Sequence, residues 1–489
     1  MTMTDQLDTQ RQSQQTGPVL TNRARPALWD ATPHLRPHLH FTARDTWLND
    51  PNGLITHHGT HHLFFQNNPA DRVWGNMSWG HATSPDLFDW TEQEVAITGD
   101  THEAIFSGSA VWDRANSTGF GVDAHGDGPL VAVFTSAYQK HPVRGDEQAQ
   151  SLAYSLDDGA TWTKYEHNPV LARGSDNFRD PKVIWHEPTH RWVMVAVEAM
   201  ERQVLIHTSE DLTHWELAST FGPAGATEGI WECPDLLQVP VVDHDQNPTG
   251  ELGWVLLVSV QTHAPAGGSG MQWFTGDFNG QTFTAEATDQ PRWFDLGTDM
   301  YAAVSFNGTN RVIGWMSNWS YADSSPTRPW ASAMTLPREI SLVREGAGPG
   351  LRHSFVLPNG WVACVVDAEG HVPPHGAYEI RGTMADDAAL SLSRRCDDRL
   401  SSLTVLRTAE GVLVERTDAS EAAVHTGFET ITAPLPEGPI DIQLVEDHGL
   451  IEMLFNRGRT SVTVQTFPVD GPLEIHAAHL KVQVRGHGA

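Results

Sequence analysis

The sequence predicts an all-β protein in which a five-bladed β-propeller is followed by a C-terminal β-sandwich. Short apolar runs of β type, separated by turn residues, recur between residues 37 and 340, where long helical periodicity is hard to find. A motif of Ser or Thr, then Asp, then an aromatic residue recurs four times at similar offsets. A Gly/Pro-rich stretch then leads into a second series of short alternating runs.

Residues 1–36 are interpreted as a disordered or extended tail. The opening stretch, MTMTDQLDTQRQSQQTGPVL, is polar and contains no apolar segment of the kind that a secretory signal carries. We therefore expect a cytoplasmic protein. No apolar run in the chain approaches about 18 residues, so no membrane span is expected.

Residues 37–343 are expected to form the propeller. The repeats SPDLFDW, SLDDGATW, SEDLTHW and TGDFNGQTF end at Trp90, Trp162, Trp215 and Phe283, at intervals of 72, 53 and 68 residues. A four-stranded blade takes at least about 40–50 residues and tolerates insertions in its loops. We interpret each repeat as the same hairpin turn in a successive blade. Ser and Asp are expected to close the turn, with the aromatic residue packed behind it.

Residues 344–354, which begin with REGAGPG, are expected to be a linker. Residues 355–489 contain alternating runs such as GVLVERT and IDIQLVED, which are typical of a β-sandwich. This region offers few candidate catalytic residues, so we expect it to be an accessory domain.

The charge of the chain limits its partners. Its 61 acidic and 31 basic residues give a net charge of −30, which argues against nucleic acid or an anionic membrane as a partner. Three cysteines cannot form a disulfide framework, and none lies in a C-x-x-C pair that would suggest a zinc site. The sequence gives no indication of the oligomeric state.

The stretch THHGTHHL holds four histidines, His57, His58, His61 and His62. Gly59 and the following Thr lie between two β runs and predict a hairpin, in which neighbouring side chains of a strand point to opposite faces. We therefore expect no metal site at these histidines.

Three carboxylates have contexts unlike those of ordinary surface residues: Asp50 in WLNDPNG, Asp180 in NFRDPKV and Glu232 in IWECPDLL. Each is followed closely by Pro, which stiffens the chain, and each has an aromatic residue within three positions. Loops at one end of a propeller converge on its axis, so distant residues can meet there. Two carboxylates flanking a bond are what glycoside hydrolysis uses, and crowding them raises the pKa of at least one. Arg179 is expected to keep Asp180 ionised, which would leave the proton on Glu232.

These motifs resemble glycoside hydrolase family 32, the invertase, inulinase and levanase group, over about residues 37–485. WLNDPNG resembles the family signature Trp-Met-Asn-Asp-Pro-Asn-Gly, with Leu48 in place of Met. Further blocks follow in family order, namely FFQNNP, WGNMSWGHATSPDL, FSGSA, FRDPK, WECPDL, GWMSNW and LPRE. The later stretch IEMLFNRG resembles a Glu-containing strand of the family's sandwich domain.

The resemblance implies an exo-acting β-fructofuranosidase that retains configuration and needs neither cofactor nor metal. Asp50 would be the nucleophile, Glu232 the general acid/base, and Asp180 the group that binds fructose hydroxyls and stabilises the transition state. Positions matching the fructose subsite are Asn49, Gln66, Trp74, Phe106, Ser107, Arg179 and Trp315. The substrate would be sucrose, a fructo-oligosaccharide or a fructan, and a cytoplasmic location favours the short saccharides.

Other functions are compatible with parts of the sequence. The same site would serve a fructosyltransferase, or a fructanase specific for levan or inulin. SLDDGATW fits the Asp-box of sialidase propellers, but sialidases use a Tyr nucleophile and an arginine cluster, and this chain has only six Tyr. A fructan-binding lectin that has lost catalysis is disfavoured because all three carboxylates are present.

Overall fold

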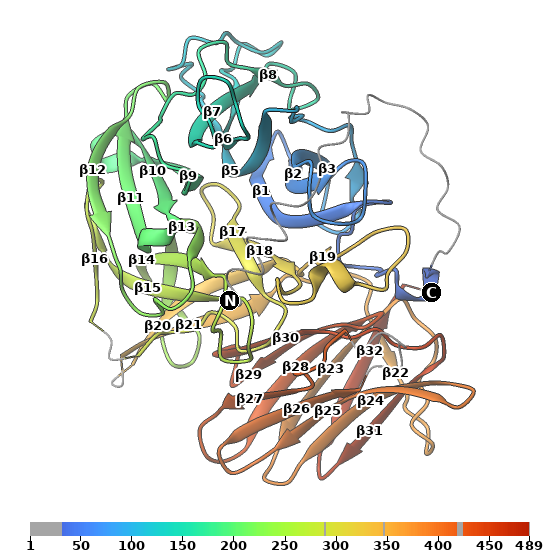
Figure 1. The fold of residues 1–489 in the computed structure, drawn as a ribbon. Helices are drawn as coiled ribbons and strands as arrows, with labels where there is room; N and C mark the ends of the chain where they lie inside the picture. Colours follow the sequence, from blue (N-terminus) through green and yellow to red (C-terminus); the bar gives the residue numbers. More distant parts are fainter. Residues whose placement is uncertain (1–31, 288–289, 346–347, 418–423, 489) are drawn as a thin grey trace.

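The computed structural model describes residues 32–488 except 288–289, 346–347 and 418–423, and it confirms a five-bladed propeller followed by a β-sandwich (Figure 1). Most of the predicted N-terminal tail, residues 1–31, lies outside the described residues. The 3₁₀ turn η1 (Pro33–Leu35) follows directly.

Blades I to III are separate antiparallel sheets of four strands each. Their strands are β1 (Trp47–His57), β2 (Thr60–Asn68), β3 (Ser78–Ser84) and β4 (Thr91–Glu92); β5 (Glu103–Trp112), β6 (Leu130–Tyr138), β7 (Gln148–Ser155) and β8 (Thr163–Lys164); and β9 (Phe178–His186), β10 (Arg191–Glu198), β11 (Gln203–Ser209) and β12 (Glu216–Phe221). The turns η2 (Glu187–Thr189) and η3 (Ala199–Glu201) lie on either side of β10.

Blades IV and V form one continuous sheet, because β20 pairs in parallel with β13 as well as antiparallel with β18. Their strands are β13 (Trp231–Val242), β14 (Pro248–Val260), β15 (Gly270–Phe278) and β16 (Phe283–Ala285), then β17 (Tyr301–Ser305), β18 (Arg311–Met316), β19 (Ala333–Met334), β20 (Arg338–Glu345) and β21 (Gly348–Phe355). The turn η4 (Ala322–Ser324) precedes β19.

The first three sequence repeats are confirmed as hairpin turns between the third and fourth strands of blades I to III. In blade I, the Ser84 hydroxyl accepts hydrogen bonds from the backbone N–H groups of Asp86 and Leu87, and Asp86 Oδ1 accepts two further backbone N–H groups. The fourth repeat differs, because Asn279 rather than the expected Asp277 closes its turn by accepting two backbone N–H groups.

The propeller ring closes where blade V meets the chain around β1. Ala331 donates its backbone N–H to the carbonyl of Thr46 at 3.1 Å, and Leu48 donates in return to the carbonyl of Ala331 at 3.2 Å. Met334 donates to the carbonyl of Phe41 at 2.8 Å. Main-chain hydrogen bonds therefore join the two ends of the propeller sequence.

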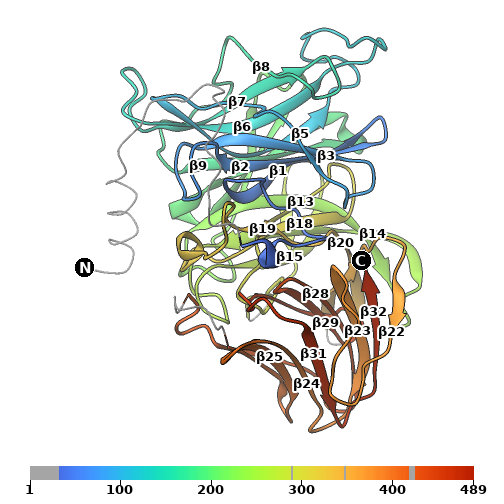
Figure 2. The same ribbon diagram turned by 90° about the vertical axis from the view of Figure 1, so that its right-hand side faces the viewer.

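The sandwich packs two sheets against each other below the propeller (Figure 2). One sheet runs β22 (Val362–Cys364), β32 (Val482–His487), β23 (Ala377–Met384), β28 (Ile440–Asp447), β29 (Leu450–Phe455) and β30 (Thr460–Gln465); the other runs β27 (Thr430–Pro434), β26 (Gly411–Thr417), β25 (Arg399–Arg407), β24 (Ala389–Cys396) and β31 (Leu473–Ala478). Alternate residues of these strands, such as Leu390 and Leu392, enter the shared apolar core, as the period of a strand requires.

The predicted linker at residues 344–354 is not a loose connection. Residues 348–355 form β21, which pairs with β20 from Glu345–Gly348 to Arg338–Phe355. Pro349 is tolerated in β21 because this strand lies at the edge of its sheet. We propose that the propeller extends to Phe355 and that the sandwich unit begins after it.

A buried charged cluster joins the propeller to the sandwich. Arg338 of β20 donates to Glu452 of β29 through Nε at 2.8 Å and through Nη2, and to Asp295 through Nη1 at 3.3 Å. His40 contacts Asp447 through Nδ1 at 2.7 Å and Glu452 through Nε2 at 2.9 Å. The motifs LPRE and IEMLFNRG thus meet in one ion-pair cluster, from which solvent is excluded.

This cluster predicts a loss of stability at high pH. Burial alone would lower the pKa of His40, but hydrogen bonds to Asp447 and Glu452 outweigh it and raise the pKa to about 9, from an ordinary 6.5. The stabilisation is therefore fully present below pH 6.5 and is lost as the pH rises through 9. We expect the urea midpoint of unfolding to fall between pH 7 and pH 10 in the wild type. His40→Gln should be less stable at pH 7 and should show a smaller fall, and equal falls in both proteins would contradict this assignment.

Candidate active site

The site is built on the first strands of the blades. β1, β5, β9, β13 and β17 contact one another in turn around the ring (Figure 1). Each carries an irregularity in its pairing next to a predicted or observed site residue, such as Asp50 in β1, Ser107 in β5 and Glu232 in β13. A β-bulge bends its strand and re-aims a side chain. The bulges therefore let strands from five blades turn side chains towards a common centre.

Asp50 lies in β1 and is held through one of its two carboxylate oxygens. Ser107 of β5 donates its hydroxyl to Asp50 Oδ2 at 2.7 Å, and the thiol of Cys233 in β13 lies 3.4 Å from the same oxygen. Asp50 Oδ1 is buried and has no hydrogen-bond partner among the described residues. One oxygen is thus fixed by hydrogen bonds, and the lone pairs of the other have no partner among these residues.

Asp180 meets Asp50 through Cys233. The backbone N–H of Cys233 donates to Asp180 Oδ2 at 3.0 Å, and the backbone N–H of Asp180 donates to the hydroxyl of Thr135 at 2.9 Å. Asp180 and Cys233 both have left-handed backbone, with φ of 62° and 46°. Such strain in non-glycine residues is concentrated at functional sites.

Glu232 is held by Arg179 and Tyr301. Arg179 Nη2 donates to Glu232 Oε1 at 3.0 Å, and the Tyr301 hydroxyl donates to Oε2 at 2.5 Å. Arg179 approaches Asp180 only through Nε, at 3.9 Å. Arg179 was expected to keep Asp180 ionised, but the carboxylate to which it donates a hydrogen bond is that of Glu232. The bend in β9 turns the guanidinium towards β13 instead.

Burial dominates the electrostatics of the site. It raises the pKa of Asp50, against the hydrogen bond from Ser107 and with the help of the charge on Glu232. Burial also raises the pKa of Asp180, to about 7. The positive charge of Arg179 offsets only part of this rise, and the negative charges of Glu232 and Asp50 add to it. Three carboxylates thus share one nearby guanidinium, and the group is expected to retain a proton near neutral pH.

The residues predicted for the saccharide subsite fall into two groups. Asn49 accepts a hydrogen bond from Trp47 Nε1 at 2.7 Å, and Gln66 donates to the carbonyl of Ile105 at 3.0 Å, so both are fixed beside the carboxylate strands. Half-buried aromatic rings make up the second group, with the rings of Trp74 and Phe106 6.2 Å apart.

Trp315 does not line the site as expected, because its side chain is fully buried. Its ring lies 6.1 Å from that of Trp47 and 6.2 Å from that of Tyr301, so it supports these residues from behind. Trp47 is also fully buried, and its indole N–H orients Asn49.

Sequence reasoning missed Tyr301, Thr135 and the contacts that Cys233 makes with the two aspartates. Tyr301 opens the first strand of blade V, and its position as an aromatic residue at that strand's start was the only signal available. Thr135 lies on β6 and carries no motif. The left-handed backbone at Cys233, which joins two carboxylates, could not be inferred from a single sequence.

Comparisons with known proteins place the chain in a family. The model of the glycosyl hydrolases family 32 N-terminal domain matches residues 40–349. An extracellular exo-inulinase of Aspergillus niger is 45% identical, over 88% of this chain and 89% of its own length. A levanase of Bacillus subtilis is 37% identical, over 92% of this chain and 69% of its own. The crystal structure of exo-inulinase from Aspergillus awamori has a TM-score of 0.83 at 32% identity, over 94% of this chain and all of that one.

These relatives contradict the predicted cytoplasmic location, because several of the matching exo-inulinases are extracellular. The prediction depended on the composition of the first residues, most of which lie outside the described part of the chain. Short saccharides were favoured as substrates because of that location, so this preference no longer holds.

The helices of the described residues are four short 3₁₀ turns, and none is long and apolar enough to cross a membrane.

Proposed function

Because this chain belongs to glycoside hydrolase family 32, we propose that its carboxylate site cleaves terminal β-D-fructofuranosyl units with retention of configuration. The matching exo-inulinases, levanase and invertases support an exo-acting fructosyl hydrolase activity for this chain. The main support for this mechanism is the uneven environment of Asp50, in which one oxygen accepts hydrogen bonds and the other has no partner among the described residues.

In the first step, Asp50 Oδ1 attacks C2 of the fructosyl unit and the bond from C2 to the glycosidic oxygen breaks. Glu232 gives its proton to the departing oxygen, and a fructosyl ester on Asp50 results. Ser107 supports this step because its hydroxyl fixes Asp50 Oδ2, while the lone pairs of Oδ1 have no hydrogen-bond partner among the described residues.

In the second step, Glu232 takes a proton from water, which attacks C2 and releases fructose and free Asp50. Arg179 and Tyr301 both donate to Glu232, so they stabilise its ionised form once the proton has left. Asp180 lies beside the reacting centre and would accept hydrogen bonds from fructose hydroxyls. Its charge would also stabilise the positive charge that develops on the sugar.

The substrates proposed are sucrose, fructo-oligosaccharides and the fructans inulin and levan. Inulin and levan are included because the relatives are named exo-inulinase and levanase. Transfer to a second sugar would use the same fructosyl ester, with a saccharide hydroxyl in place of water. Product analysis on sucrose, kestose, inulin and levan separates the two. Fructose as the sole new product indicates hydrolysis from the chain end, whereas longer products indicate transfer.

Asp50→Asn should lower kcat on sucrose by roughly 10⁴-fold or more, because an amide is a very poor nucleophile for this displacement. The variant should keep its fold, since the amide oxygen can still accept the hydrogen bond from Ser107. Activity within a few fold of wild type would refute the role of Asp50. NMR of the first product separately tests the stereochemistry, which should be β-fructofuranose before it mutarotates.

A further inference from the structure

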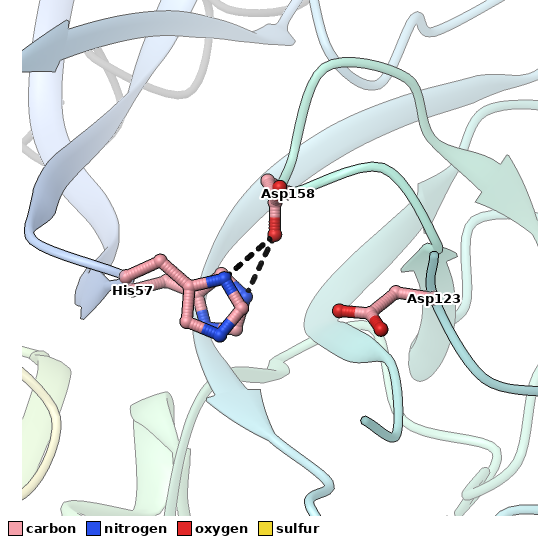
Figure 3. Close-up of side chains that lie close together, drawn as sticks. His57, Asp123 and Asp158 are labelled. Carbon is pink, nitrogen blue, oxygen red and sulfur yellow. Dashed lines mark hydrogen bonds and ion pairs between the residues drawn. The ribbon is translucent and has the colours of Figure 1, made fainter. Parts of the chain in front are cut away.

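A second cluster of potential ligands lies at the outer end of β1, seven residues along the strand from Asp50. His57 and His58 form the tip of the β1–β2 hairpin of blade I. Asp123 comes from the loop between β5 and β6, and Asp158 from the turn between β7 and β8, both in blade II. Figure 3 shows the side chains of His57, Asp123 and Asp158 lying close together. Each residue offers one ligand atom, and these atoms all lie within 4.8 Å of one another.

The spacing of these atoms is close to what a metal ion requires. His57 Nε2 and His58 Nδ1 each lie 3.1 Å from Asp158 Oδ1 (Figure 3). Ligands about 2.0–2.2 Å from a tetrahedral zinc ion are separated from each other by roughly 3.4 Å. Small side-chain movements would therefore open the cluster around one ion.

The two imidazoles are held in place by packing. His57 is buried, and its ring lies 3.9 Å from that of His58. Both rings meet the indole of Trp112 edge-on, at 4.7 Å and 5.6 Å.

The carboxylates of the cluster are also held in place, and none of them forms an ion pair with a Lys or Arg of the described residues. Asp123 Oδ1 accepts the backbone N–H groups of His125 and Asp127, which fixes the loop. Asp127 itself approaches His58 at 3.7 Å, and His125 approaches Asp158 at 3.9 Å. Among the described residues, histidines supply all the ion-pair contacts within 4.0 Å of Asp127 and Asp158.

We propose that His57, His58, Asp123 and Asp158 bind one divalent transition-metal ion of the zinc type, which ties the blade I hairpin to blade II. Two imidazoles favour zinc, nickel or copper over magnesium and calcium, which prefer oxygen ligands. The expectation that these histidines bind no metal considered only partners within the hairpin. The two carboxylates, which are 66 and 101 positions after His57, are brought there by the propeller.

The test is Zn²⁺ titration of chelator-treated protein that carries no histidine tag, followed by calorimetry. We expect one equivalent to bind and the Tm to rise by roughly 2–5 °C when free Zn²⁺ exceeds the Kd about 100-fold. Co²⁺ should give the visible absorption of a low-symmetry site, and Zn²⁺ should displace it. Ca²⁺ and Mg²⁺ at the same concentration should not.

His58→Ala and Asp123→Asn should each weaken Zn²⁺ binding at least 10-fold and abolish the Tm rise, while the metal-free proteins keep wild-type sucrose hydrolysis. His61→Asn is the matched control, since His61 lies on the same hairpin but contacts Thr56 instead. The proposal is overturned if Zn²⁺ does not bind, if the two variants bind it as tightly as wild type, if the control loses it equally, or if Ca²⁺ displaces it.

Discussion

Asp180→Asn is expected to lower kcat by roughly 10²–10³-fold or more and, at pH 8, to raise the stability of the protein. Activity falls because an amide cannot stabilise the positive charge that develops on the sugar. Stability rises because burial, together with the charges of Glu232 and Asp50, raises the pKa of Asp180 to about 7 from an ordinary 3.8. Asparagine keeps the shape, tolerates a left-handed backbone and can accept the Cys233 N–H.

The pH dependence of this gain follows from the raised pKa. The folded protein holds a proton on Asp180 that the unfolded chain releases above about pH 4, so ionisation destabilises the fold progressively between pH 4 and pH 7. The Asn variant should therefore match wild type near pH 4 and exceed it at pH 8, by on the order of 2–4 kcal/mol. Thermal unfolding at both pH values measures this.

Asp235→Asn provides a matched control for Asp180→Asn. Asp235 is also a buried carboxylate on an inner strand, but it accepts from Lys182 Nζ at 3.0 Å. Removing its charge leaves a buried ammonium without its counter-ion, so this variant should be less stable. If both variants are more stable than wild type, or if neither is, then the ionised carboxylate of Asp180 does not specifically destabilise the folded protein.

Glu452→Gln is expected to destabilise the protein by about 3–5 kcal/mol, the range observed when one member of a buried ion pair is removed. Glu452 is the common partner of Arg338 and His40, and it also accepts the backbone N–H of Leu336 at 2.6 Å. The amide can keep only part of these contacts and carries no charge. Calorimetry at pH 7 would show the loss, and kcat on sucrose at 20 °C should change little because the cluster lies apart from the carboxylate site.

Glu339→Gln is the control for Glu452→Gln. Glu339 follows Arg338 in the LPRE motif and pairs with Arg311 at 2.9 Å, but its side chain is 47% exposed. Such exposed pairs contribute at most about 1 kcal/mol. If the two variants lose the same amount of stability, burial does not determine how much the pairing of Glu452 with Arg338 contributes.

Much of the fold was predictable from the sequence because hairpin turns leave a local signal. The Ser84 and Asp86 pattern closes its turn through contacts within six residues, and so it repeats visibly along the chain. The strand at residues 348–355 was not predicted, because glycine and proline mark both loops and sheet edges. The pairing of β21 with β20 depends on the tertiary structure of the sheet and cannot be predicted from local composition.

The three carboxylates of the site were also predictable, because each belongs to a motif with its own Pro and aromatic residue. Their partners were not. The choice of Arg179 between Asp180 and Glu232 depends on the bend in β9, and the role of Tyr301 depends on where blade V meets blade IV. For Trp315 the motif match predicted a residue that lines the saccharide subsite, whereas its side chain is fully buried. A motif match cannot tell a lining residue from one that packs beneath the site.

Closure of the ring by Thr46, Leu48 and Ala331 has a consequence for refolding. Asp50 lies beside one end of this seam and Tyr301 belongs to the blade that supplies the other, so the site cannot be complete until the last blade has docked. Individual blades depend mainly on contacts between neighbouring strands, whereas the seam joins segments far apart in the chain, and such distant contacts form slowly. After dilution from denaturant, enzymatic activity should therefore recover more slowly than β-strand content. The rate at which activity returns then reports the docking of the last blade.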